Sequence, residues 1–395
     1  MVERVAFYAP LKPPTHPTPS GDRRMARALM TILERQGHAV TLASRLRSFD
    51  REGDHIRQDR IRHLSERLAD RLIRRYQAMP VDARPTVWIT YHPYHKSPDW
   101  LGPIMQRRLN LPYVAIEASF APKQAGGPWD LGHRAAEMAI RAADVTLAMT
   151  TVDHAGLAPL VGPPSTLLRF PPFLDITPFT EASRHRAAHR LDLADRFGMD
   201  VDQPWLLAVG MMRDDVKRHS YELLAETLRH LPDRRWQLLI VGDGVARPSI
   251  ERLFTSFGSE SVKCLGILGE NLLPACYAAA DVYAWPAVRE AYGMAMLEAQ
   301  ASGLPVVAGR EGGVTDIVQD GVTGMLTDPR DPIALASAIA DLLDHRTKRE
   351  AMSLAAARFV EKDHSLDRAS ALLDKALTDA SAVRRAKSRR EGAIS

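Results

Sequence analysis

The stretch Asp281–Asp331, DVYAWPAVREAYGMAMLEAQASGLPVVAGREGGVTDIVQDGVTGMLTDPRD, decides the fold prediction. It opens with the apolar run DVYAW, which predicts a strand ending at Trp285. Gly293 then opens a helix that continues to Gly303, where a glycine is a common C-terminal stop. A second apolar run, LPVVAG, follows at once. Continuous apolar strands joined by a helix are typical of a parallel sheet covered on both faces.

The same alternation of short apolar runs and longer helical stretches extends over most of the chain. Strands are expected at residues 4–9, 39–44, 86–90, 112–116 and 144–149, and again at 205–210, 236–242, 262–266, 281–285 and 304–309. The pattern therefore runs twice, which predicts an α/β protein of two Rossmann-like, doubly wound domains in series. Ligands of such sheets bind beyond the carboxyl ends of the strands, so we expect a cleft between the domains.

A stretch rich in proline and charged residues between Arg169 and Pro204 predicts the domain boundary. The first domain is expected to span residues 1–180 and the second 190–365, with a linker between them. A closing helix is expected at 366–382. The tail 383–395 is basic and poor in apolar residues, so we expect it to be disordered.

Composition and charge exclude several classes of protein. Of the 395 residues, 45% are hydrophobic and 25% charged, as in an ordinary globular protein. The net charge of +4 allows anionic partners without calling for nucleic acid. Cys264 and Cys276 alone cannot form a disulfide framework, which indicates a reducing compartment. No apolar run is as long as a membrane span, and the N-terminus lacks a signal peptide's apolar core, so we expect a cytoplasmic protein.

Two junctions in the second half carry most of the predicted chemistry. Glu290 lies at or before the start of the Gly293 helix, and Glu298 lies about two turns inside it. Free backbone amides near Gly293 and Met294 suit a phosphate, because a helix N-terminus carries partial positive charge. The alternative is that Glu290 caps the helix and Glu298 is a solvated surface residue.

The loop after the strand at 205–210 adds two cations, Arg213 and Lys217, which can neutralise a diphosphate. The alternative is a charged, solvated loop. Glycines follow three other strands and allow the backbone to approach an anion closely. They are Gly242 and Gly244, Gly312 and Gly313, and, in the first domain, Gly21.

Together these segments resemble the retaining glycosyltransferases of family 4, which have the GT-B architecture of two Rossmann-like domains facing a central cleft. Glu290 through Glu298 is similar to the family's E-x7-E motif. The acidic strand start, the GLPVV run, the paired glycines and the DGxTG turn follow in family order between residues 205 and 344. The first domain matches in outline. The resemblance implies a nucleotide diphosphate sugar donor, retention at the anomeric carbon and a C-terminal helix crossing back to the first domain.

The resemblance also implies roles for individual residues. Glu290 is expected to contact hydroxyls of the donor sugar and Glu298 those of the ribose, while the amides near Gly293 and Met294 bind the diphosphate. Arg213 and Lys217 are expected to offset the charge of the leaving diphosphate, so that Glu290, Arg213 and Lys217 are the catalytic set and no metal or other cofactor is needed. Tyr292 and the glycines Gly21, Gly242, Gly244, Gly312 and Gly313 are expected to contact the donor as well.

Departures from the family pattern concern mainly the acceptor side. Met211 stands where the family often has an arginine, and Arg213 comes two residues later. The first domain lacks the family's histidine after the strand at 112–116. His92 and Glu117 are therefore the candidates for the acceptor side, with a structural role as the alternative for each.

Arginines also crowd an expected helix near residues 60–75. Arg60, Arg67, Arg71, Arg74 and Arg75 surround an apolar stripe of Ile61, Leu64, Leu68, Leu72 and Tyr76. A basic amphipathic helix can lie on anionic lipid, which predicts peripheral contact with the inner face of the cell membrane. The alternative is a packed surface helix with solvated arginines.

The leading hypothesis is a retaining, metal-independent hexosyltransferase. Its donor is a UDP or GDP sugar, and its acceptor a glycan, as in polysaccharide biosynthesis, a lipid-linked sugar or a small molecule. The alternatives are a sugar-nucleotide epimerase of the same fold, which would act without an acceptor, and a catalytically silent nucleotide-sugar-binding protein. The presence of both glutamates and Lys217 argues against the silent protein.

Overall fold

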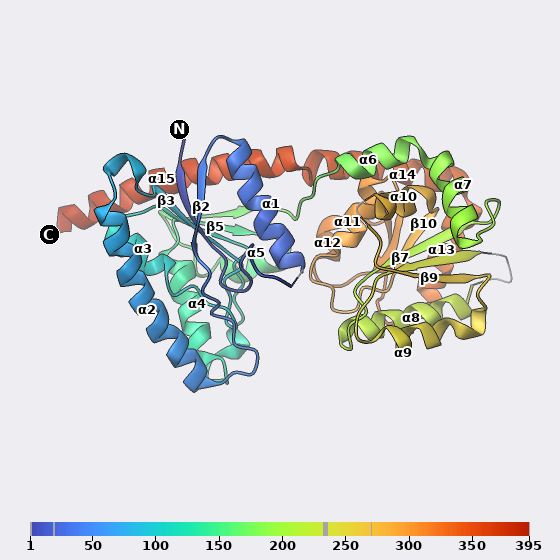
Figure 1. Ribbon diagram of the computed structural model, residues 1–395, viewed down its shortest axis with the longest axis horizontal. Helices are drawn as coiled ribbons and strands as arrows, with labels where there is room; N and C mark the ends of the chain where they lie inside the picture. The colour runs from blue at the N-terminus through green and yellow to red at the C-terminus, as the bar shows by residue number, and fades with distance from the viewer. Residues whose placement is uncertain (1, 19, 232–235, 270, 395) are drawn as a thin grey trace. The chain divides into compact units, whose positions relative to one another are not determined.

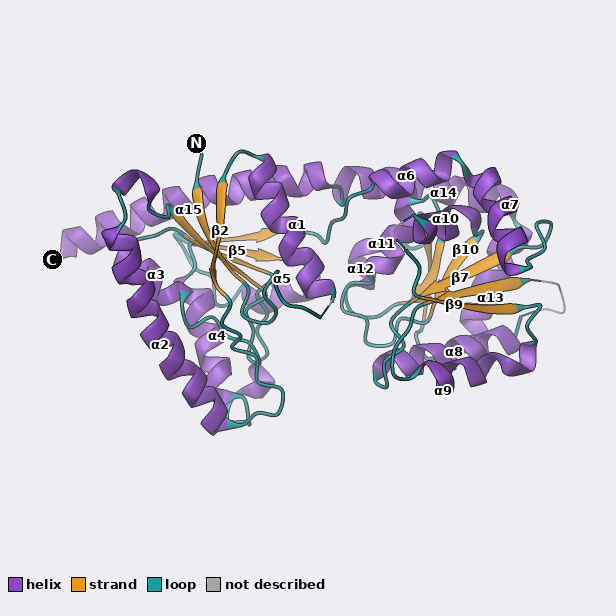
Figure 2. Cartoon of the chain, in the orientation of Figure 1, coloured by secondary structure: helices purple, strands orange, loops and turns teal. Residues whose placement is uncertain are grey.

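The computed structural model describes residues 2–18, 20–231, 236–269 and 271–394, with side chains to residue 389 (Figure 1). The chain divides into two compact units. Unit 1 holds the chain up to Pro171 together with the chain from Asp367 onward, and unit 2 is Pro172–Leu366. Each unit is built on a six-stranded parallel sheet flanked by helices (Figure 2). The predicted α/β fold with two doubly wound sheets is confirmed.

Unit 1 orders its strands β2-β1-β3-β4-β5-β6. They are β1 (Arg4–Tyr8), β2 (Ala39–Ser44), β3 (Val87–Tyr91), β4 (Tyr113–Ile116), β5 (Val145–Ala148) and β6 (Thr166–Arg169). The helices are α1 (Gly21–Arg35), α2 (His55–Ala78), α3 (Gly102–Leu109), α4 (Asp130–Ala142), α5 (Thr151–Leu157) and α15 (Leu366–Ile394), with 3-10 turns at Val81–Ala83 and Pro122–Gln124. Every residue of β3, β4 and β5 is buried, as their apolar runs predict. The direction of sheet growth reverses between β1 and β3.

Unit 2 orders its strands β12-β11-β10-β7-β8-β9. They are β7 (Trp205–Val209), β8 (Gln237–Val241), β9 (Val262–Gly266), β10 (Val282–Trp285), β11 (Val306–Gly309) and β12 (Gly324–Thr327). The helices are α6 (Thr177–Arg184), α7 (Arg186–Phe197), α8 (Val216–Arg229), α9 (Arg247–Phe254), α10 (Leu272–Ala279), α11 (Met294–Ala301), α12 (Val314–Ile317), α13 (Pro332–Asp344) and α14 (Arg346–Asp363), with a 3-10 turn at Thr255–Phe257. Here growth reverses between β7 and β10, the place where doubly wound sheets bind ligands.

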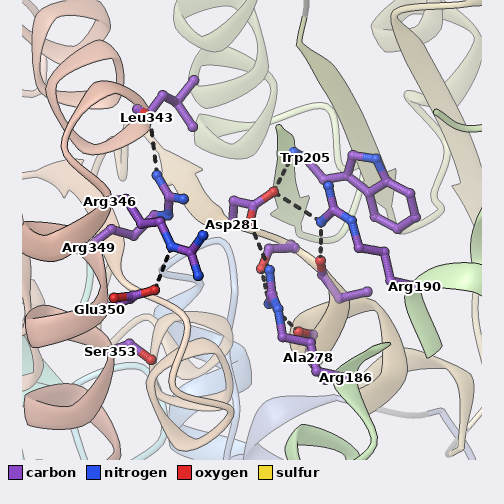
Figure 3. Close-up of polar contacts among 12 residues, drawn as sticks. Arg186, Arg190, Trp205, Ala278, Asp281, Leu343, Arg346, Arg349, Glu350 and Ser353 are labelled. Atoms are coloured by element: carbon purple, nitrogen blue, oxygen red, sulfur yellow. Dashed lines mark hydrogen bonds and ion pairs between the residues drawn. The ribbon is translucent and has the colours of Figure 1, made fainter. Parts of the chain in front are cut away.

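The stretch that the sequence predicts as a linker contains the two helices α6 and α7, and both belong to unit 2. Arginines of α7 tie it to the amino ends of the two central strands, as Figure 3 shows. Arg186 and Arg190 donate to the two carboxylate oxygens of Asp281 at 2.7 and 3.0 Å, and Trp205 N donates to the same carboxylate at 2.9 Å. The linker prediction is therefore wrong, because charged residues spaced along a helix can find partners far away in the sequence.

The prediction of a disordered C-terminal tail is also wrong. Helix α15 continues to Ile394, and from Asp367 onward it belongs to unit 1. Near its start, Gln36 Nε2 donates to Ser370 O at 2.8 Å, and near its end Lys387 Nζ lies 2.8 Å from the buried carboxylate of Asp144. Alanine, arginine and lysine are good helix formers, so a polar segment stays helical where such contacts hold it. The return of this helix to the first domain agrees with the prediction.

Helix α2 forms where the arginine-rich helix is expected, but its apolar stripe is largely covered. Leu72 and Tyr76 are buried in the core of unit 1, and Leu64 is 44% exposed. The arginines Arg60, Arg67, Arg71, Arg74 and Arg75 are exposed. The helix therefore presents charge to the solvent and buries most of its apolar face inside the unit.

Candidate active site

The predicted donor residues gather at the carboxyl edge of the unit 2 sheet. Helix α8 follows β7 and helix α11 follows β10, and these two strands are neighbours at the point of reversal. The loops that follow these strands carry Arg213 and Glu290, and the first turn of α8 carries Lys217. Parallel strands present their carboxyl ends at one edge, so residues 73 positions apart in sequence can meet there.

Lys217 and Glu290 form the central ion pair of this edge. Lys217 lies in the first turn of α8, where Asp215 caps the helix by accepting from Lys217 N at 2.9 Å. Its Nζ contacts Glu290 Oε2, and the two side chains are 16% and 13% exposed. The structure thus confirms that these two predicted residues lie together, largely shielded from water.

Trp285, the last residue of β10, contacts both members of the ion pair. The sequence analysis did not identify it as a site residue. Its Nε1 donates to Glu290 Oε2 at 3.2 Å, and Lys217 Nζ lies 5.5 Å from the centre of its ring. The indole packs edge-on against Tyr221, which donates to Gly210 O at 2.8 Å. The available signal was its position at the end of a strand, just before the loop that carries Glu290.

The loop that holds Glu290 has an unusual backbone. Ala287 and Arg289 have φ values of 60° and 48°, in the left-handed region that side chains rarely adopt, and Gly293 follows with φ 81°. Arg289 N donates to Glu311 Oε2 at 2.9 Å, which holds one of these residues in place. Left-handed residues other than glycine cost of order 1–3 kcal/mol each and gather at functional sites.

Gly312 and Gly313 support this loop through the backbone. Gly312 has φ 56°, and a Cβ there would collide with the carbonyl oxygen of Glu290. Gly313 N donates to Ala291 O at 3.1 Å. In the structure, Gly312 and Gly313, which were predicted to contact the donor, pack against the backbone of the Glu290 loop and hold it in place.

Gly242 and Gly244 play the same part for the loop that leads to Lys217. Their φ values are 149° and 155°, and Cβ atoms would collide with the carbonyl oxygens of Gly210 and Met212 respectively. Gly210 N donates to Val241 O at 3.0 Å, and Met212 N donates to Asp243 O at 2.9 Å. The loop after β8 therefore braces the loop after β7.

The N-terminus of α11 offers backbone amides beside this pair. Gly293 is the N-cap and supplies no side chain, so the amides of the first turn have no side-chain cap. Met294 opens the helix, and Tyr292, which precedes the cap, is partly buried. Uncapped amides and the helix dipole attract an anion, as the sequence predicts for the diphosphate.

Glu298 and Arg213 stand apart from the ion pair. Glu298 is 5% exposed, and its Oε2 accepts from Tyr277 OH at 2.9 Å, so the structure adds an internal partner to the predicted ribose contact. The half-exposed Arg213 has its Nε 3.2 Å from Asp215 Oδ2, on the cap of α8. The structure therefore brings Lys217 and Glu290 together and leaves Arg213 with the helix cap.

His92 and Glu117, the two acceptor-side candidates, meet in unit 1. His92 follows β3, Glu117 follows β4, and His92 Nδ1 lies 3.3 Å from Glu117 Oε1 and 3.1 Å from Asp22 Oδ1. Both His92 and Glu117 have left-handed backbones, with φ values of 60° and 57°. Asp22, at the start of α1, was missed as a functional residue, although its loop and neighbour Gly21 had been singled out. A Cβ at Gly21 would meet no atom within 4 Å.

The two carboxylates set the charge of His92. Burial disfavours the imidazolium, but the charges of Glu117 and Asp22 outweigh it and raise the pKa of His92 to about 9. The pKa of Asp22 is lowered, because its hydrogen bond and charge interaction with His92 outweigh the effect of burial. At neutral pH the cluster therefore holds a protonated imidazole between carboxylates.

The described residues form neither a metal-binding cluster nor a membrane-spanning helix. Among the residues that the structure describes, no group of three or more His, Cys, Asp or Glu side chains is arranged to hold a metal ion. Within the same residues, no helix combines the length and the apolar character needed to cross a lipid bilayer.

Comparison with known proteins points to one family. Residues 203–345 match the family model described as glycosyl transferases group 1. The chain is 30% identical over 243 residues to D-inositol 3-phosphate glycosyltransferase of Xylanimonas cellulosilytica, covering 60% of this chain and 57% of that protein. It is 33% identical over 226 residues to GDP-mannose-dependent alpha-(1-6)-phosphatidylinositol monomannoside mannosyltransferase of Mycolicibacterium smegmatis, covering 54% and 56%. The chain spans less than two thirds of the length of these relatives.

Solved structures support the fold. Sucrose-phosphate synthase from Thermosynechococcus elongatus matches with a TM-score of 0.72 and 19% identity, over 99% of this chain and 100% of that one. Anabaena Alr3699/HepE in complex with UDP matches with a TM-score of 0.72 and 17% identity, over 95% and 99%. At this level of identity the likeness concerns the fold, and the predicted GT-B class is confirmed.

Proposed function

Because residues 203–345 match the family model described as glycosyl transferases group 1, we propose that this protein transfers a hexose-type sugar from a nucleotide diphosphate sugar to an acceptor hydroxyl. The observation that carries the proposal is the Lys217–Glu290 pair next to the uncapped N-terminus of α11. We infer that the ion pair breaks when the donor binds and that both side chains then contact the donor. The diphosphate takes Lys217 Nζ and the α11 amides, and the hydroxyls of the sugar take the Glu290 carboxylate.

The geometry suits the departure of a diphosphate. As the bond between the anomeric carbon and the diphosphate oxygen breaks, negative charge grows on the leaving group. A preorganised ammonium and helix amides stabilise this charge more in the transition state than in the ground state. Lys217 and α11 supply the counter-charge, so the proposed step calls for no divalent metal.

We propose that transfer proceeds with retention. The acceptor oxygen forms its bond to the anomeric carbon on the face from which the diphosphate leaves, and the acceptor proton passes to a diphosphate oxygen. His92, with its pKa of about 9, is protonated at neutral pH and so acts as a hydrogen-bond donor toward the acceptor, with Glu117 and Asp22 holding it in place. The acceptor is a glycan, a lipid-linked sugar or a small molecule.

A screen of donors tests the proposal directly. Thermal unfolding is followed with UDP, GDP, ADP and TDP sugars, since a relative named for GDP-mannose and a fold neighbour solved with UDP make both bases worth testing. A donor at 100 times its dissociation constant adds about 2.7 kcal/mol of stability. The stabilising donor is then incubated with acceptors, and the anomeric configuration of the product is read by NMR. Conversion of the donor without an acceptor would identify an epimerase, and stabilisation without any turnover a silent binding protein.

We also propose that unit 1 contacts anionic membrane through α2, which would bring the enzyme to a lipid-linked acceptor. The exposed Arg67, Arg71 and Arg74 support this, and burial of the apolar stripe means that the attraction is electrostatic. Replacing these three arginines with glutamate should weaken sedimentation with phosphatidylglycerol vesicles, and unchanged sedimentation would refute the contact.

A further inference from the structure

A basic cavity lies on unit 1 where the C-terminal half of α15 passes the turn between α3 and β4. It has a volume of about 380 Å³. Its lining consists of Asn110 and Pro112 from the turn and of Ser381, Arg384, Arg385, Ser388 and Arg389 from the helix. None of these described lining residues is acidic.

The helical spacing explains why so many cations share one cavity. Positions 381, 384, 385, 388 and 389 follow one another at intervals of three and one residues, which places them on one face of a helix. Lys387, the other described cation of this stretch, is engaged by the buried carboxylate of Asp144 at 2.8 Å. The cavity face thus collects three guanidinium groups together with hydroxyl and amide groups.

Arg384 is buried in the lining of the cavity and is held in place by a hydrogen bond. Its residue is 5% exposed, and its Nε donates to Asn110 Oδ1 at 2.7 Å. Ser388 Oγ donates to the same amide oxygen at 2.9 Å, so Asn110 orients two groups of the lining. Arg385 and Arg389 are exposed and can close on a ligand from the solvent side.

We propose that this cavity binds a phosphoryl anion, either a soluble di- or polyphosphate or a phosphate carried on a lipid headgroup. Guanidinium groups match phosphate oxygens in charge and in geometry, and three of them line this cavity within two helical turns. The site is separate from the His92 cluster, because Asn110 and Pro112 precede β4 and Glu117 follows it, at the opposite end of that strand.

The test uses the full chain and inorganic pyrophosphate as the probe. Calorimetric titration compares Lys217→Ser with the triple variant Lys217→Ser/Arg385→Ser/Arg389→Ser, since the Lys217 background weakens anion binding in unit 2. We expect at least tenfold weaker binding in the triple variant. Arg358→Ser/Lys362→Ser in the same background, which removes two exposed cations of α14, should bind like Lys217→Ser. Helical circular dichroism verifies that α15 persists.

Vesicles distinguish the two sources of phosphate. In the otherwise native chain, Arg385→Ser/Arg389→Ser is compared with the unsubstituted protein in sedimentation with phosphatidylglycerol vesicles and with phosphatidylcholine vesicles. Loss of pyrophosphate binding supports a soluble anion, and loss of sedimentation with phosphatidylglycerol alone supports a headgroup. If the unsubstituted cavity binds neither probe, or if neither changes in the variant, the proposal is overturned.

Discussion

The carboxyl edges of the two sheets hold charge in opposite ways. In unit 2 one cation, Lys217, meets one carboxylate, Glu290, beside the positive end of α11. In unit 1 a single imidazolium, His92, meets two carboxylates, Glu117 and Asp22. The ammonium group and helix end of the first edge suit a diphosphate, whereas the cluster at the second edge has one carboxylate more than it has cations. The comparison supports the proposal that the donor binds at unit 2 and that unit 1 contacts hydroxyl groups of the acceptor.

The units also differ in how they hold these residues. In unit 2, glycines let one backbone press against another, as Gly242 does against Gly210 and Gly312 against Glu290. In unit 1 the side chains of the cluster hold one another, and the residues that bear His92 and Glu117 have left-handed backbones without being glycine. Unit 2 should thus be sensitive to added volume and unit 1 to pH.

The largest expected effect comes from Glu290→Gln, which removes the charge and keeps the shape. We expect sugar transfer to fall on the order of 10²–10³-fold, because the sugar loses its carboxylate partner. Stabilisation by the nucleotide diphosphate should persist, since Lys217 and the α11 amides remain. Transfer rates and ligand-induced melting shifts measure the two properties separately.

Glu222→Gln is the matched control for this variant. It removes a carboxylate of α8 that pairs with Arg218 on the exposed side of that helix. We expect it to transfer sugar at the normal rate. Full activity of Glu290→Gln would show that the Lys217–Glu290 ion pair has no role in sugar transfer. The proposed difference in function between the two edges would then be wrong.

A pH titration probes unit 1. The pKa of His92 is about 9 in the folded protein and about 6.5 in an unfolded chain, so the cluster stabilises the fold fully below pH 6.5 and loses this contribution as the pH rises through 9. The stability advantage over His92→Gln should therefore shrink by on the order of 2–3 kcal/mol between pH 6 and pH 10. Urea unfolding at several pH values measures it.

His345→Gln is the control for this titration, because His345 is 63% exposed in its pair with Asp341. Its effect on stability should vary much less over the same range. A pH-independent difference between the unsubstituted protein and His92→Gln would mean that the two carboxylates do not hold the histidine in its charged form.

Gly242→Ala tests the glycine brace of unit 2. The new Cβ would meet the Gly210 carbonyl oxygen at a φ of 149°, so we expect a loss of about 1–3 kcal/mol. For a unit of this size that lowers the melting temperature by about 2–4 °C per kcal/mol. Gly269→Ala, where a Cβ would meet no atom within 4 Å, should leave melting unchanged. Equal melting of both variants would show that the loops adjust freely.

The same contrast explains what the sequence could predict. At the carboxyl edge of unit 2 the motifs are contiguous, since Glu290, Gly293 and Glu298 lie within nine positions of one another and Lys217 lies in the first turn of the helix that follows β7. The ten predicted strands are all present, and most of them are near-continuous apolar runs. The sequence did not predict β6 and β12, which are four-residue strands at the edges of the sheets. All residues of β6 are half-buried, and in β12 buried and half-buried residues alternate.

What the sequence could not predict depends on contacts between distant residues. Asp22, His92 and Glu117 come from three separate segments, and local spacing says nothing about their meeting. Trp285 lies only five positions from Glu290, but the contact between them depends on the path of the intervening loop, which residue spacing does not reveal. The helical tail depends on partners such as Asp144, more than 200 positions away from Lys387. Helix propensity alone does not determine whether such a polar segment is helical or disordered.

The smallest expected effect concerns the arginine face of α2 in unit 1. A single exposed arginine near an anionic surface is worth about 1 kcal/mol, so Arg71→Gln should weaken partitioning onto phosphatidylglycerol vesicles roughly fivefold. The loss should fade in high salt, because the interaction is electrostatic and most of the apolar stripe is covered. Arg358→Gln on α14 of unit 2 removes the same charge from the other unit and should leave partitioning unchanged. Equal losses in both variants would mean that net charge, and not the α2 face, attracts the protein to lipid.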